Sequence, residues 1–420
     1  MHNNDIIKLL GFQPLNEKYI VRDTKFTEKE VQISIDTIKL STPCPKCGHT
    51  CNKKKDTRIR ILKHGYINGL KCIIRLKYIR YKCNCCNSSF YESISDMCEK
   101  YYRHTNSSIN NVKNNLGNFK ISVASISKMN NMNVKLINKL YAIKVHEMKL
   151  NNIVALPPNI GIDEFKGNMK VSINGKRIKV KYQMQITNLD TGDIVALIPI
   201  KDEKNIKAFL RNIKNKKDVK NVVIDMSMQF KKLFKTEFKN AAISVDNFHV
   251  TKLVVTAVDK IRIELWHKYV NDKTELAKEI RQYLKSLKPY LLTDFIACKN
   301  EKYKTTITEK LNKIFANIPE LKVAYDKLQE FYNIKRLQSS NDKILIFKDW
   351  LNSIDIEVLS TFKSVKKTMF HWFTYIKNAF ITGFSNGKTE GNNNSIKVLK
   401  RVSYGFVNFE NAVNRILVSC

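Results

Sequence analysis

The sequence lacks any long apolar run, because no stretch approaches the roughly 18 apolar residues that a membrane-spanning helix needs. The N-terminus, MHNNDIIKLLGF, also lacks the long apolar segment of a secretory signal peptide. No segment matches the GxxxxGKS or GxxxxGKT pattern of a phosphate-binding loop. We therefore expect a cytoplasmic protein that has no membrane partner and uses no nucleotide cofactor.

Acidic residues are scarce, since 38 of them stand against 74 lysines and arginines, for a formal net charge of +36. An excess of this size indicates a polyanionic partner such as nucleic acid. Lysine, asparagine and isoleucine are abundant along the whole chain, so the charge predicts a class of partner without identifying a site. With 420 residues and 43% hydrophobic content, the chain can build about two to four units with real cores.

Eight of the ten cysteines fall between residues 44 and 98. In a cytoplasmic protein they are thiols or metal ligands rather than disulfides. Two CxxC pairs have ligand spacing, and together they complete a tetrahedral thiolate site for a structural zinc ion. The expected ligands are Cys44, Cys47, Cys83 and Cys86. Nearby alternatives are His49, Cys51 and Cys85.

Between the cysteine pairs lie RIRILKHGYINGL and KCIIRLKYIRYK, in which basic and apolar residues alternate. Alternation with a period of two predicts strands. Strands between two CxxC turns are typical of a zinc ribbon, and we assign residues 1–100 to an N-terminal segment that contains one.

Residues 101–156 have the pattern of a helix-turn-helix. Ser127, Asn131 and Ile137 lie where this motif needs a small residue, a turn residue that tolerates positive φ and a buried aliphatic residue. The second helix should run from about Val134 to Tyr141. The side chains expected to face the major groove of double-stranded DNA are Lys135, Asn138 and Lys139. Two helices packed by chance, with a solvated lysine face, are the alternative.

Leu156-Pro157-Pro158 breaks the helical pattern and marks a domain boundary. Beyond it, residues 157–250 combine three strands with alternating helices and strands, which predicts a mixed α/β layer. Two of the buried strands end in carboxylates, one at Asp163 and the other at Asp225.

Asp163 and Asp225, on neighbouring strands, would bring two negative charges together. Their repulsion is costly unless a divalent cation lies between them. Glu390 can supply a third carboxylate. Three carboxylates can hold two Mg²⁺ or Mn²⁺ ions about 4 Å apart, which is the arrangement used for in-line displacement at phosphorus. For either aspartate alone a turn or capping role is the simpler interpretation, and Glu164 is an alternative to Asp163.

Glu390 opens a helix with two different faces. At about 100° per residue, Asn394, Lys397 and Arg401 share its face. The opposite, apolar face contains Ile396, Leu399 and Val402. A carboxylate followed by cations suits a metal ion and then a phosphate backbone. The cations expected to contact DNA are Lys397, Lys400 and Arg401. An ordinary amphipathic helix with a solvated basic face is the alternative.

His249 and Asp246 fall at the end of a predicted last strand, AAISVDNFHV. His249 can donate a hydrogen bond to a phosphate and Asp246 can act as a fourth carboxylate, although a structural histidine is an equal alternative. Residues 251–384 have a helical pattern rich in aromatic residues, which predicts a helical insertion before Glu390. Residues 385–420 then return to the α/β core.

These motifs, taken together and in this order, resemble the ISL-three type of bacterial insertion-sequence transposase. The blocks that carry the resemblance are CPKCG with a second CxxC, GIDEF, VVIDM, DNFHV and EGNNNSIKVLKRVSYGFVNFENAVNRI. The resemblance implies a DDE transposase with an RNase H-like catalytic core and a helical insertion. It places the catalytic triad on Asp163, Asp225 and Glu390, and it matches His249 to a family histidine. The family usually has arginine where this chain has Asn247.

We therefore predict an α+β multidomain protein with a zinc ribbon, a helix-turn-helix and an RNase H-like α/β core interrupted by a helical insertion. The predicted function is a DNA transposase that binds terminal inverted repeats, cleaves DNA with Mg²⁺ or Mn²⁺, and joins the free 3′-hydroxyl to target DNA. Two ends must meet, which implies a dimer or larger assembly on double-stranded DNA, in the bacterial cytoplasm and on the nucleoid when bound. A non-catalytic sequence-specific DNA-binding protein and a metal-dependent nuclease without joining activity are the alternatives.

Overall fold

The computed structural model describes residues 3–12, 18–118, 120–148, 154–173, 175–295 and 301–419. The chain divides into two compact units, each discontinuous in sequence. The first contains residues 1–151, 168–179 and 395–420, and the second contains residues 152–167 and 180–394. Both units combine helices and strands, which confirms the mixed α+β class. Within the described residues, no helix is long and apolar enough to cross a membrane.

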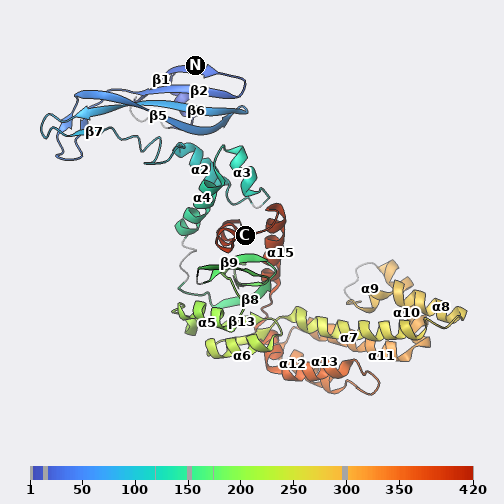
Figure 1. Cartoon of the computed structure of the whole chain (residues 1–420). Helices are drawn as coiled ribbons and strands as arrows, with labels where there is room; N and C mark the ends of the chain where they lie inside the picture. The colour runs from blue at the N-terminus through green and yellow to red at the C-terminus, as the bar shows by residue number, and fades with distance from the viewer. Residues whose placement is uncertain are drawn as a thin grey trace. The chain divides into compact units, whose positions relative to one another are not determined.

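The N-terminal part of the first unit is a five-stranded sheet in the order β1-β2-β6-β5, with β7 also paired to β6 (Figure 1). Strands β2 and β6 are parallel, and the other pairs are antiparallel. Asn68 and Gly69 have positive φ values of 47° and 81° and form the tight turn between β5 and β6, as an Asn-Gly pair favours. The elements are α1 Asn3–Leu9, β1 Tyr19–Phe26, β2 Glu30–Thr37, β3 Thr42–Pro43, β4 Thr50–Cys51, β5 Lys54–Ile67, β6 Leu70–Lys82 and β7 Ser89–Tyr91.

Three helices follow in the first unit. Asn131, in the turn between the second and third, has a φ of 50°, and Ile137 is fully buried among the three. The third helix extends past its predicted end at Tyr141, because the apolar stripe continues to the buried Val145. These helices are α2 Asn106–Asn115, α3 Val123–Met129 and α4 Val134–Glu147. The C-terminal helix α16 (Phe409–Ser419) packs against α4 and strand β9. Strand β9 (Met169–Ile173) pairs with β10 (Lys176–Val180).

The second unit contains a five-stranded sheet in the order β12-β11-β8-β13-β14. Strand β11 is antiparallel to both of its neighbours, whereas β13 is parallel to β8 and to β14. Residues 222–224 of β13 are completely buried, as expected for a strand covered on both faces. The elements are β8 Asn159–Phe165, β11 Gln183–Asn188, β12 Ile194–Ile198, α5 Glu203–Arg211, the 3₁₀ turn Lys216–Asp218, β13 Asn221–Ile224, α6 Met228–Glu237 and β14 Ala242–Val245.

The predicted last strand is wrong in its second half. Strand β14 ends at Val245, and helix α7 (Asn247–Lys268) begins two residues later, with Asp246 at the N-cap position. His249 therefore lies in the first turn of a helix, not at the end of a strand. The physical reason is the spacing of buried residues, since Val250 and Val254 are buried four positions apart whereas Phe248 is exposed.

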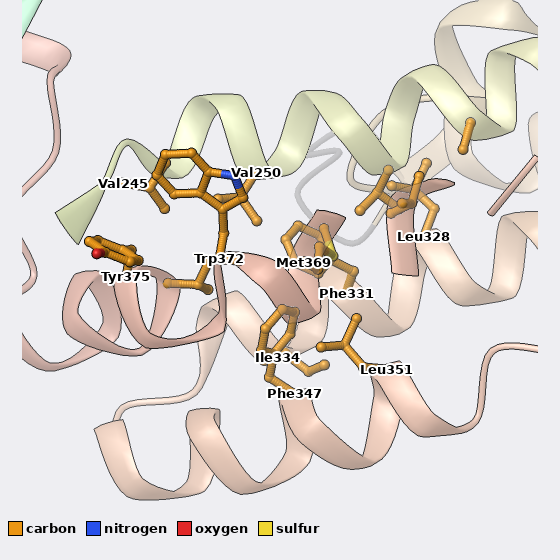
Figure 2. Packing of buried hydrophobic residues seen from close by; sticks show 14 of the residues in the cluster. Val245, Val250, Leu328, Phe331, Ile334, Phe347, Leu351, Met369, Trp372 and Tyr375 are labelled. Carbon is orange, nitrogen blue, oxygen red and sulfur yellow. The ribbon is translucent and has the colours of Figure 1, made fainter. Parts of the chain in front are cut away.

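Helices dominate the rest of the second unit and share one hydrophobic core with its sheet. Figure 2 shows Phe331, Phe347, Met369 and Trp372 packed together in this core. The predicted helical insertion is thus continuous with the unit that contains β8 and β13. The elements are α7, α8 Glu275–Ser286, α9 Lys288–Leu291, α10 Glu301–Asn317, α11 Pro319–Arg336, α12 Ser340–Asn352, α13 Phe362–His371, α14 Phe373–Thr382 and α15 Gly387–Val402. Helix α15 is divided between the two units after Asn394, so the units do not follow the predicted segments.

Candidate active site and metal centre

Asp163 and Asp225 lie level with one another on neighbouring strands. Strands β8 and β13 run parallel, and Gly161 of β8 lies opposite Val223 of β13. Asp163 comes two positions after Gly161, and Asp225 comes two positions after Val223. Strand β8 extends beyond Asp163 to Phe165, whereas Asp225 directly follows the last residue of β13. The two carboxyl groups are close enough for each to change the pKa of the other.

Glu164, the alternative to Asp163, is oriented differently. Its carboxylate pairs with Lys201 Nζ at 2.5 Å. Its backbone N–H donates to Asp163 Oδ1 at 2.7 Å, which helps to fix that carboxylate. Asp163, rather than Glu164, is therefore the acidic side chain that faces Asp225.

The two aspartates carry an electrostatic cost. Burial, followed by the charge of Asp163, raises the pKa of Asp225 to about 7. Burial also raises the pKa of Asp163, although the Glu164 N–H opposes that change. Two buried carboxylates this close together cannot both ionise cheaply unless a cation compensates their charge. Hard oxygen donors of this kind fit Mg²⁺ or Mn²⁺.

His249 lies beside these carboxylates in the first turn of α7. Its Nδ1 is 3.4 Å from Asp225 Oδ1 and 3.6 Å from Asp246 Oδ2. Asp246, with a smaller contribution from Asp225, raises the pKa of His249. The imidazole is thus biased toward its charged form, in which both ring nitrogens donate hydrogen bonds.

Asp246 is buried and has a further partner. Its Oδ1 accepts the backbone N–H of Asn386, at 3.1 Å, just before helix α15. The side chain of Asn386 donates through Nδ2 to the carbonyl of Ile162 at 3.3 Å. Asp246 and Asn386 therefore anchor the start of α15 to the sheet.

Glu390 lies in the first turn of α15 and is exposed. Asn386 precedes it by about one turn, and Asn393 follows it by about one turn, on the same side of the helix. Both asparagines contact strand β8, because Asn393 Nδ2 donates to Asp163 Oδ2 at 2.6 Å. Glu390 therefore lies on the side of α15 that faces the strand of Asp163. Its carboxylate is nevertheless not close to both aspartates. Within the described residues, the carboxylate oxygens of Glu390, Asp163 and Asp225 do not all lie within 4.8 Å of one another.

A buried polar chain orients Asn393. Gln185, opposite Asp163 in the pairing of β11 with β8, donates through Nε2 to Asn393 Oδ1 and to the carbonyl of Thr389, each at 2.8 Å. Because the amide oxygen of Asn393 is engaged, its NH₂ group faces Asp163. Sequence reasoning missed Gln185 and Asn393. For Asn393, the sequence offers one signal, the run of three asparagines after Gly391. Asparagine is a poor residue for a helix interior, so such a run indicates a role other than helix formation.

Gly161 sets how closely α15 approaches β8. A Cβ atom at this position would lie 2.5 Å from Thr389 Oγ1 and 2.6 Å from Asn386 Oδ1. A larger side chain there would force these buried side chains, or the helix itself, to shift. Glycine therefore allows the first turn of α15 to pack directly on the strand that carries Asp163.

In the first unit, four cysteines form a cluster that can hold a metal ion. Their Sγ atoms all lie within 4.8 Å of one another, and two of the pairs are 3.6 Å apart. Sulfurs about 2.3 Å from a tetrahedral zinc ion lie about 3.8 Å from each other, so the cluster fits zinc. The cluster consists of Cys44, Cys47, Cys83 and Cys86. The alternatives lie outside it, since Cys85 is exposed and Cys51 Sγ donates to the carbonyl of His49.

The three residues predicted to face the major groove lie on α4. Lys135 and Lys139 are exposed and Asn138 is half-buried. Lys139 Nζ lies 5.2 Å from the centre of the Tyr102 ring. Asn138 also lines a cleft of about 360 Å³ together with Tyr404 and its neighbours. Any DNA on this face of α4 would therefore also meet the segment that follows α15.

The amphipathic prediction for α15 is confirmed for Ile396 and Leu399, which are buried, whereas Val402, the third residue of the predicted apolar face, is half-buried. Lys397 and Arg401 are exposed and Lys400 is half-buried. The contact of these cations with DNA stays a prediction.

This chain is similar to one protein family and, over a shorter stretch, to one individual protein. A transposase family of the ISL3 type, a DDE group, matches residues 160–416. A protein of Lactococcus lactis subsp. lactis described as an ATP-dependent protease is 31% identical over 113 residues, which is 27% of this chain and 35% of that protein. The chain thus spans about a third of the length of that curated relative.

Proposed function

Because the chain belongs to the ISL3-type transposase family, we propose that it is a DNA transposase whose active site contains Asp163, Asp225 and Glu390. The observation that carries the site is the pair of level, mutually perturbed aspartates on β8 and β13. A second contact supports the role of Glu390, since Asn393 of the same helix bonds to Asp163. All of these residues belong to the second unit.

We propose an RNase H-like core for this unit. The sheet supports the proposal, because β8 pairs with the antiparallel strand β11 on one side and with the parallel strand β13 on the other, in the order β12-β11-β8-β13-β14. In such a core, acidic side chains from adjacent strands and from a late helix converge. The helices from α7 to α14 then correspond to the insertion that precedes the glutamate.

The chain's own residues have distinct tasks in this proposal. Asp163 and Asp225 hold divalent cations, and Glu390 joins them from α15. When bound, these cations would activate the attacking oxygen and stabilise the leaving oxygen at phosphorus. His249, biased toward its charged form, donates a hydrogen bond to a phosphate oxygen of the DNA.

DNA recognition belongs to the first unit in this account. The four-cysteine cluster, with zinc, holds the turns at the end of the long strands β5 and β6. Helices α3 and α4 act as a helix-turn-helix for the terminal repeats, and two bound chains bring the two element ends together. The proposed DNA contacts are Lys135, Asn138, Lys139, Lys397, Lys400 and Arg401.

The reaction type is tested with labelled duplexes that carry the element's end, a plasmid target and Mg²⁺ or Mn²⁺. A transposase yields cut ends and plasmid-joined products. Cutting without joining would indicate a nuclease, and specific binding without cutting would indicate a non-catalytic DNA-binding protein. The control is Asp225→Asn, which should bind the duplex normally and yield neither product.

A further inference from the structure

A groove in the first unit is lined by cations and tyrosines. It has a volume of about 710 Å³ and lies between strands β5 and β6 and the segment that follows β7. Its cations are Arg58, Arg60, Lys100 and Arg103. Its tyrosines are Tyr78, Tyr91, Tyr101 and Tyr102. The acidic residue on the lining, Glu92, is buried and accepts hydrogen bonds from the Thr37 hydroxyl and the Ile79 N–H. The open surface of the groove is therefore positive.

The positive charge of the groove is not neutralised by the protein. Among the residues that the structure describes, no carboxylate pairs with any of the four cations. Arg60 instead donates through Nη2 to the backbone carbonyls of Tyr102, at 2.5 Å, and Glu99, at 3.3 Å. These bonds fix the guanidinium in place without a counter-charge. Concave surfaces with uncompensated charge of one sign attract ligands of the opposite sign.

Two of these tyrosines, Tyr91 and Tyr101, are exposed, whereas Tyr78 is buried. The ring centre of Tyr91 lies 5.7 Å from the guanidinium of Arg58 and 5.3 Å from that of Arg80, and Tyr78 packs against it at 5.4 Å. Tyr101 has a left-handed φ of 69° and is 85% exposed. This conformation is uncommon for a residue with a side chain, and here it holds a large ring in solvent.

Cations that contact phosphates and rings that stack on bases are the two components of sites for unpaired nucleic acid. The volume of this groove is that of a small-molecule site, so a duplex would lie across its mouth whereas an unpaired base can enter. An acidic peptide would use the cations but would leave the exposed ring of Tyr101 without a stacking partner. We propose that this groove binds a short unpaired stretch of DNA, with its phosphates on the arginines and a base stacked on Tyr101.

The proposal goes beyond the catalytic function and requires no cleavage. It is tested on the full-length, zinc-loaded protein by fluorescence anisotropy with a labelled single strand of about ten thymidines. Tyr101→Ala should weaken binding about 10-fold without changing the salt dependence, because stacking contributes about 1–3 kcal/mol per base and no charge is lost. Tyr66→Ala, in β5 outside the groove lining, should bind like the wild type.

A charge-matched pair completes the test. Arg58→Gln should weaken binding and reduce the slope of log K against log salt by about 0.7, as expected for one lost phosphate contact on a single strand. Arg75→Gln removes the same charge from an exposed position on β6 outside the groove, and it should change binding less. Equal weakening by the two arginine variants would overturn the proposal, as would unchanged binding by Tyr101→Ala.

Two further measurements keep the outcome unambiguous. Each variant should retain the zinc content and melting temperature of the wild type, which shows that the groove is folded. Tyr101→Ala should not weaken binding of the same sequence as a duplex, and an equal loss on the duplex would contradict a site for unpaired DNA. Asp225→Asn should bind the single strand normally, so failure of the cleavage proposal and failure of this one are distinguishable.

Discussion

Asn393 Nδ2 donates a hydrogen bond to Asp163 Oδ2 at 2.6 Å. Asn393 follows Glu390 by one turn of α15, and Asp163 lies on β8, so this bond ties the helix of the proposed glutamate to the strand of the first aspartate. Gln185 fixes the direction of the amide, because its Nε2 donates to Asn393 Oδ1 at 2.8 Å. We infer that Gln185 and Asn393 are positioning residues for the Asp163 carboxylate.

Replacing Asn393 should weaken metal binding. Asn393→Leu keeps the approximate shape but removes the donor to Asp163, and partners of metal-binding carboxylates are typically worth 10- to 100-fold in affinity. We therefore expect about a 10-fold loss of Mn²⁺ affinity, measured by calorimetry on the DNA-free protein. The control is Asn392→Leu, which loses a bond to the carbonyl of Gly192 instead and should keep its Mn²⁺ affinity.

A double-mutant cycle separates positioning through Asn393 from independent effects. Gln185→Met should weaken Mn²⁺ binding less than Asn393→Leu does, because Asn393 can still donate to Asp163. In the double variant, loss of Gln185 should add little, since the group that it orients is already gone. If the fold-losses of Mn²⁺ affinity in the two single variants multiply in the double variant, Gln185 and Asn393 act separately.

Gly161 should tolerate a side chain poorly. Gly161→Ala places a Cβ atom 2.5 Å from Thr389 Oγ1, so the buried Thr389 side chain or α15 itself must shift. We expect a lower melting temperature and a loss of DNA cleavage, with a destabilisation of about 1–3 kcal/mol as for other overpacked cores. Gly391→Ala is the control, because its Cβ would meet nothing within 4 Å and alanine favours the helix by about 1 kcal/mol. Equal destabilisation by both changes would remove close packing as the reason.

The metal-free protein should lose stability as the pH rises from about 4 to about 7. Folding raises the pKa of Asp225 from 3.8 to about 7, and the pKa of Asp163 and of His249 is raised as well. A raised pKa means that the folded state binds more protons, so the stabilisation is complete below the unfolded pKa and is lost as the pH passes through the folded pKa. The stability that His249 contributes is lost only above about pH 6.5, which is the pKa of histidine in the unfolded chain.

Melting temperatures across this pH range, with a chelator present, measure the effect. Mg²⁺ should restore stability most at the upper end, where the carboxylates are charged. Asp225→Asn should flatten the profile. A wild-type profile that rises with pH in the absence of metal would contradict the electrostatic account of the two aspartates.

Loss of a cysteine from the four-cysteine cluster should remove zinc, whereas loss of a cysteine outside the cluster should not. Cys44→Ser removes one of four sulfurs, and because metal binding is coupled to folding we expect loss of bound zinc and of specific binding to the element's end. Cys85→Ser is the matched control, since Cys85 is exposed and outside the cluster. Zinc analysis and a binding assay check both variants. Full zinc content and normal end binding in Cys44→Ser would refute the assignment.

Local signals in the sequence were enough to single out the two aspartates that the structure brings level with one another. Asp163 and Asp225 each come at or near the end of an apolar run, and a charged residue there is conspicuous without knowledge of the fold. Strand β2 also has a local signal in the sequence, because the buried Val31, Ile33 and Ile35 alternate with more exposed residues. The end of β14 was misplaced because DNFHV suits a strand or the start of a helix.

The contacts around Asn393 could not be predicted from the sequence. The bond from Gln185 to Asn393 joins residues 208 positions apart, and neither amide differs in type from many others in this asparagine-rich chain. The same holds for Gly161, where a glycine is needed because Thr389, which is distant in sequence, packs against this position. Such roles follow from strand register and helix packing, which local patterns do not specify.

The most direct test of the central claim compares wild type with Glu390→Gln on a labelled duplex of the element's end in Mg²⁺. We expect both proteins to bind the duplex with the same affinity and salt dependence, because Glu390 makes no contribution to DNA recognition. Only the wild type should cut the end. Near-normal cutting by Glu390→Gln would contradict the claim that α15 completes the site begun by Asp163 and Asp225.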